Sequence, residues 1–70
     1  MKSISFVIVV VDPAQNVQYV KSISPTKGTF KPTPNKKIAK TYKTTDAVTK
    51  DLDFLSAFVM QGYNFYYEEV

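Results

Sequence analysis

The chain opens with an apolar run in which both alternating sets of side chains are hydrophobic. Within residues 3–11, SISFVIVVV, one set comprises Ile4, Phe6, Ile8 and Val10, and the other comprises Val7, Val9 and Val11. Successive side chains of a β-strand point to opposite faces of the sheet. The run therefore predicts a central strand whose two faces both need cover.

Further along, the pattern predicts three more strands. Residues 12–16, DPAQN, have the composition of a turn, and 17–23, VQYVKSI, are typical of a strand that pairs antiparallel with the first. Residues 24–37, SPTKGTFKPTPNKK, combine three prolines with four lysines and predict a long, flexible loop. A short strand over 38–43 and a last, aromatic strand over 63–70 complete the set.

One amphipathic helix is predicted between the last two strands. Its apolar residues recur at i, i+4, i+7 and i+11, at Val48, Leu52, Leu55 and Val59. Thr44 and Thr45 offer an N-cap, and Asp46 places a carboxylate in the first turn, where the helix dipole favours negative charge. Gly62 stands where a left-handed C-cap would end a helix of about four turns.

These elements predict a single α+β domain over residues 1–70, with the order β-β-β-α-β. A right-handed crossover through the helix and a first strand apolar on both sides favour a four-stranded mixed sheet of order 3-2-1-4, with the helix packed on one face. Since one helix covers one face only, the opposite face is expected to be an open apolar patch, lined by Val7, Val9, Val11, Val20 and Tyr66.

The open patch predicts a protein-protein interface. Self-association as a homodimer would also give a chain of 70 residues the additional buried area that so small a core lacks. The sequence therefore predicts a small binding protein that acts through this sheet face, on a second copy or on another protein.

The composition argues against catalysis. The chain has neither Cys nor His, which excludes disulfides, thiolate sites and zinc sites of the ordinary ligand type. Its carboxylates are spread between a turn, the helix and the C-terminus, and its glycines, Gly28 and Gly62, are isolated, so the sequence contains no calcium-type or phosphate-cradling loop. We therefore expect no catalytic residue, no metal, no cofactor and no small-molecule substrate.

A basic segment offers an alternative function. Residues 1–45 carry eight Lys and one Asp, whereas residues 46–70 carry one Lys and five acids. Lysines interleaved with aromatic residues, here Phe30 and Tyr42, suit non-specific nucleic-acid binding through phosphate contacts and base stacking. The candidate residues are Lys27, Lys31, Lys36, Lys37, Lys40, Tyr42 and Lys43. The competing interpretation is a solvated segment whose lysines protect a sheet edge. The absence of Arg disfavours sequence-specific reading.

The C-terminal half also resembles a known group of proteins. The run Ala39-Lys40-Thr41-Tyr42-Lys43-Thr44, then Ala47 and Leu52, then Gly62-Tyr63-Asn64-Phe65 and the ending Glu68-Glu69-Val70 are similar to short reading frames of phages and mobile elements in Gram-positive bacteria. The resemblance implies a small accessory protein, in a group of which some members bind a host or phage protein, and it carries over no catalytic residue. No apolar stretch approaches the roughly 18 residues of a membrane span, and the expected location is the cytoplasm of the host cell.

Overall fold

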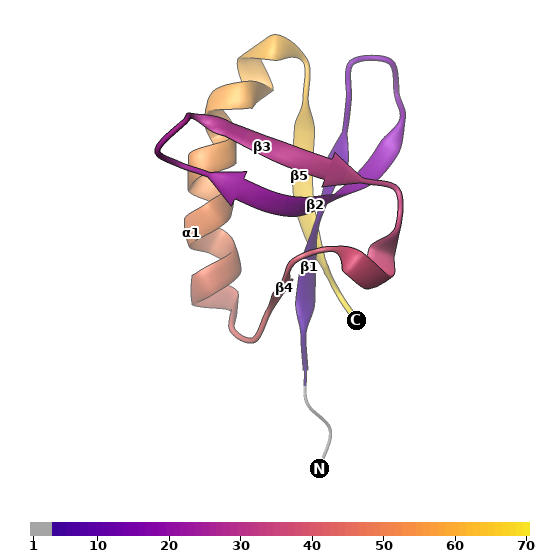
Figure 1. Ribbon diagram of the computed structural model, residues 1–70, viewed down its shortest axis with the longest axis vertical. Helices are drawn as coiled ribbons and strands as arrows, with labels where there is room; N and C mark the ends of the chain where they lie inside the picture. The colour runs from indigo at the N-terminus through magenta and orange to yellow at the C-terminus, as the bar shows by residue number, and fades with distance from the viewer. Residues whose placement is uncertain (1–3) are drawn as a thin grey trace.

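The computed structural model describes residues 4–70, which form five strands, one α-helix and two short 3-10 helices (Figure 1). In chain order the elements are β1 (Phe6–Val11), β2 (Val17–Ser24), β3 (Thr29–Thr33), η1 (Lys36–Ile38), β4 (Thr41–Tyr42), α1 (Thr45–Leu55), η2 (Ser56–Gln61) and β5 (Asn64–Glu69). In Figure 1, β1 and β5 run side by side through the middle of the molecule, and β2 and β3 cross in front of them. Among the helices of residues 4–70, none has the length and apolar character needed to cross a membrane.

β1 is the centre of the sheet. β5 pairs with it along Phe6–Val11, while the opposite edge of β1 is shared between β2, at Val9–Val11, and β4, at Phe6 and Val7. This arrangement confirms the α+β fold, the central first strand and the last strand beside it. The prediction of four strands in a mixed sheet is wrong in detail, because the sheet has five strands and every pairing is antiparallel.

The fifth strand comes from the segment that the sequence predicts as a flexible loop. Residues 24–37 hold β3 and η1, and β3 takes the place beside β2 that was expected for the strand over 38–43. Prolines are compatible with this position because β3 is an edge strand, where Pro is tolerated. Phe30, in the middle of the segment, attaches β3 to the body through an edge-to-face contact with Phe58 at 4.9 Å between ring centroids.

The helix begins where the sequence predicts. Thr44 is the N-cap, its Oγ1 accepts a hydrogen bond from the Ala47 N–H at 3.1 Å, and Asp46 lies in the first turn. After Leu55 the helix tightens into η2, and Gly62 ends it with a φ of 100°, in the left-handed region. The predicted four-turn helix is therefore an α-helix continued by a 3-10 segment.

The main core lies on the face of the sheet that α1 covers, which we call the helix face. Its buried members are Ile8, Val10, Val20, Tyr42, Val48 and Leu55. The other face, which carries Val7, Val9 and Val11, is called the rear face.

Val20 belongs to the core and not to the rear-face patch in which the sequence analysis places it. The turn after β1 sets Tyr19 opposite Val9 on the rear face, so Val20, the next residue, points to the helix face. A bulge after Val20 then brings Ile23 to the same core. The prediction failed because a shift of one residue in strand register exchanges the faces of all side chains, and the turn geometry sets that register.

Candidate protein-binding edge

The rear face of the sheet is buried, contrary to the expectation of an open patch. Val7 and Val9 are each 1% exposed, and Val11 is half-buried. Tyr66 is the member of the predicted set that stays exposed, at 48%. The prediction that the three valines form an accessible interface is therefore wrong for Val7 and Val9, because the chain covers these two itself, while Val11 is only partly covered.

The cover includes a strap, residues 34–40, which runs from β3 to β4 and contains η1. Within it, the Nζ of Lys36 lies 3.0 Å from Oε1 of Glu68 and 5.8 Å from the ring centroid of Tyr19. Since Tyr19 belongs to β2 and Glu68 to β5, the Lys36 side chain joins the two strands that flank β1. The hydrogen bond to Glu68 raises the pKa of Lys36 above its ordinary value.

The predicted nucleic-acid site loses its aromatic residue to the core. The Tyr42 ring is 5% exposed, and its hydroxyl donates a hydrogen bond to the Asp51 carboxylate. Burial, together with that hydrogen bond, raises the pKa of Tyr42 above its ordinary value. Lys40 pairs with the same carboxylate at 3.2 Å, and Lys36 is paired with Glu68. The other lysines of the set lie exposed, at Lys27, Lys31, Lys37 and Lys43. The stacking role expected of Tyr42 is therefore wrong.

β5 is an edge strand with one open side. Within residues 4–70 it pairs only with β1. The Val70 N–H donates to the Ser5 C=O at 2.8 Å, and in an antiparallel ladder every second residue back from that point also directs its backbone groups to β1. The N–H and C=O groups of the residues between, Phe65, Tyr67 and Glu69, therefore point away from β1. They define the outer edge of β5.

Aromatic side chains flank this edge on both faces of the sheet. Tyr67 lies on the helix face, where its ring packs edge to face on Phe6 at 5.5 Å between centroids. Tyr66 lies on the rear face, opposite Val9 of β1. Tyr66 and Tyr67 are 48% and 42% exposed, so a strand added to the outer edge would find aromatic contacts above and below it.

Two edge strands of the sheet, β3 and β5, differ in how they resist pairing. β3, at the other end of the sheet, carries Lys31 and Pro32, and both residue types commonly protect edge strands from association. β5, NFYYEE, has neither Lys nor Pro, and its charges are confined to the end, at Glu68 and Glu69. Of these two edges, β5 is therefore the one suited to receive another strand.

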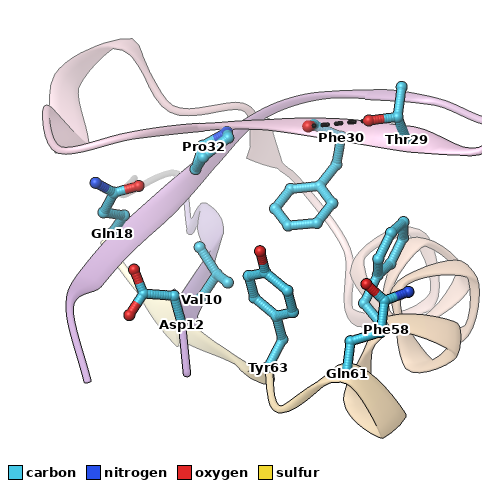
Figure 2. A pocket seen from close by; sticks show the side chains of 9 residues that line it. All are labelled: Val10, Asp12, Gln18, Thr29, Phe30, Pro32, Phe58, Gln61 and Tyr63. Atoms are coloured by element: carbon cyan, nitrogen blue, oxygen red, sulfur yellow. Dashed lines mark hydrogen bonds between the residues drawn. The ribbon is translucent and has the colours of Figure 1, made fainter. Parts of the chain in front are cut away.

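A cleft of about 250 Å³ opens between the β2–β3 hairpin and the end of η2 (Figure 2). Phe30, Phe58 and Tyr63 line it, and they pack edge to face on one another. At its rim Asp12 accepts hydrogen bonds from the backbone and side chain of Asn16, and the backbone bond lowers the pKa of Asp12. Pockets for small ligands usually measure about 300–1,000 Å³. In residues 4–70 no three acidic side chains gather as metal ligands would.

Comparisons of the chain with protein-family models, with curated proteins and with solved structures gave no match. The functional assignment therefore depends on the chemistry of the chain itself.

Proposed function

We propose that this chain is a small, non-enzymatic binding protein that adds an extended segment of a protein partner to the outer edge of β5. The observation that carries the proposal is the row of backbone groups at Phe65, Tyr67 and Glu69 that point away from β1. Sheet edges of this kind bind extended segments through main-chain hydrogen bonds, while neighbouring side chains select the partner. An accessory role of phage type and a cytoplasmic location stay predictions from the sequence.

The proposed interface lies at an edge of the sheet and not on its rear face. Val7 and Val9 are covered in the single chain and contribute to stability, whereas Tyr66 flanks the outer edge and contributes to binding. Each main-chain hydrogen bond adds about 0.5–1.5 kcal/mol net, and each cross-strand aromatic contact adds about 0.2–1 kcal/mol. A partner strand with apolar or aromatic side chains would gain both contributions.

Linear peptides selected from a random displayed library provide probes for this edge. We expect the selected peptide to shift the amide resonances of Phe65, Tyr67 and Glu69 most strongly and to slow their hydrogen exchange. Two variants separate backbone from side-chain binding. Tyr67→Pro removes an outward N–H and leaves the β1–β5 ladder intact, a placement that edge strands tolerate, whereas Tyr67→Ala removes the side chain and keeps the N–H.

The Tyr67→Pro variant should bind the peptide about two- to tenfold more weakly than Tyr67→Ala, because only the former loses a main-chain donor. Circular dichroism checks that both variants fold. Equal binding by the two variants, or shifts centred on the cleft or on β3, would contradict the proposal.

A further inference from the structure

We infer that the partner of the outer edge is a second copy of this chain, paired antiparallel through β5 about a two-fold axis at Tyr66. The inference rests on the proposed function and adds the identity of the partner. It follows from the symmetry of the strand, from the placement of its charges and from the contrast with the other sheet edge.

Symmetry limits the possible registers. Opposite residues of an antiparallel ladder point to the same face. A two-fold axis perpendicular to the sheet leaves the helix faces of both copies on one side of the joint sheet and both rear faces on the other. A closed pair therefore requires one residue of the strand to lie opposite its own counterpart at the axis. For β5, Asn64–Glu69, that residue is Tyr66 or Tyr67, because any other centre leaves at least half of the strand unpaired.

Charge and aromatic pairing select Tyr66 for the axis. In that register Phe65 of each copy faces Tyr67 of the other, and Tyr66 faces Tyr66, so aromatic pairs form on both faces of the sheet. Glu68 then faces the uncharged Asn64. With Tyr67 at the axis, by contrast, Tyr66 and Phe65 would face glutamates, and a single aromatic pair would remain.

The contrast between the two edges favours a closed pair over an open chain of molecules. Pairing of β5 with β3 of another copy would be head to tail, would leave one edge free at each end and would continue indefinitely. Lys31 and Pro32 on β3 oppose such pairing. Pairing of β5 with β5 uses the less protected edge of each copy, and association ends at the dimer because both outer edges of β5 are then occupied.

Cysteine cross-linking tests both the dimer and its register, and the chain contains no cysteine of its own to interfere. The backbone groups of Tyr66 point to β1, so two Tyr66 residues at the axis form a pair without mutual hydrogen bonds, with Cα atoms about 4.5 Å apart. A disulfide fits that separation. In the same register the two Tyr67 residues lie diagonally across the strand pair, with Cα atoms about 7–8 Å apart, which is too far for a disulfide.

Under mild oxidation we expect Tyr66→Cys to form covalent dimers at least about tenfold faster than Tyr67→Cys, because only the former meets the disulfide geometry. Both sites are about half exposed, so neither variant opens the core. Sedimentation of the unmodified chain should show a mass that rises to the dimer with concentration.

A second substitution checks the register without oxidation. Tyr66→Lys places two ammonium groups opposite each other in the inferred pair and should weaken it in sedimentation, since like charges directly opposite are destabilising. With Tyr67 at the axis, the same lysine would face Glu68 of the other copy and strengthen the pair.

Faster cross-linking of Tyr67→Cys, or stronger association of Tyr66→Lys, would overturn the register. A chain that sediments as a monomer at every concentration, with equally slow cross-linking of both cysteine variants, would overturn the dimer. That failure is distinguishable from failure of the proposed function, because a selected peptide could still map to Phe65, Tyr67 and Glu69.

Discussion

Truncating Val9 to alanine measures how well the chain covers the rear face of its own sheet. Val9 is 1% exposed, and the substitution removes two methyl groups at about 0.8 kcal/mol each. The cavity left behind adds to this loss. We therefore expect Val9→Ala to lower the free energy of unfolding by about 2–3 kcal/mol, which is a large part of the roughly 3–5 kcal/mol typical of so small a core.

Val17→Ala is the matched control. Val17 lies opposite Val11 and so shares the rear face, but it is 57% exposed, and its truncation should cost less than about 0.5 kcal/mol. Urea unfolding followed by circular dichroism measures both variants, and a slope near 1 kcal/mol per molar urea would convert the Val9 loss into a midpoint about 2–3 M lower.

Protein concentration identifies what covers Val9. Burial within the single chain predicts the same loss for Val9→Ala at low and at hundredfold higher concentration. If Val9→Ala lowered the free energy of unfolding as little as Val17→Ala at every concentration, the rear face would be open. If the loss appeared only at high concentration, a partner and not the chain would cover Val9.

Two further predictions concern single side chains. Gly62→Ala should lower the free energy of unfolding more than Gly28→Ala. Both glycines have positive φ, but a Cβ added at Gly62 would lie 3.1 Å from Pro13 Cγ, whereas a Cβ added at Gly28 would meet nothing within 4 Å. The urea midpoints of the two variants measure the difference. Because burial raises the pKa of Tyr42 above the ordinary 10.0, the folded chain keeps this proton where the unfolded chain loses it, and stability falls as pH rises above 10. Tyr42→Phe should reduce the slope of that fall by about 1.4 kcal/mol per pH unit. If the free energy of unfolding depended on pH in the same way with and without this substitution, the raised pKa of Tyr42 would not be its cause.

Local signals predicted much of the fold. The doubly apolar run placed β1 at the centre of the sheet, where strands are buried on both faces. The capping groups at Thr44 and Gly62 fixed the limits of the helical segment because each acts through backbone atoms a few residues away. Such contacts are encoded in short stretches of sequence.

Long-range contacts escaped prediction. Residues 24–37 have the composition of a solvated loop, yet the same lysines and prolines are compatible with an edge strand, and only the pairing with β2 distinguishes the two. The strap was missed for a similar reason. A lysine usually marks solvent, but a long lysine side chain can cover apolar surface while its charged group stays in water, as Lys36 does beside Tyr19.

The candidate site was predicted only in part. Tyr66 was placed correctly at an exposed position of an edge strand, whereas the interface was expected on the sheet face because one helix covers one face. The hydrogen-bonding direction of β5 follows from its register with β1, and composition carries no information about register.

Hydrogen exchange at single amides of β5 reports whether the outer edge of this strand receives another strand. At high concentration of the chain, or with the selected peptide at saturation, the outward amides of Phe65, Tyr67 and Glu69 should exchange more slowly than in the dilute chain. The inward amides of Tyr66 and Glu68 should change little, because β1 protects them throughout. Outward amides that exchange equally fast in the dilute chain, at high concentration and with the peptide would show that no strand is added to this edge.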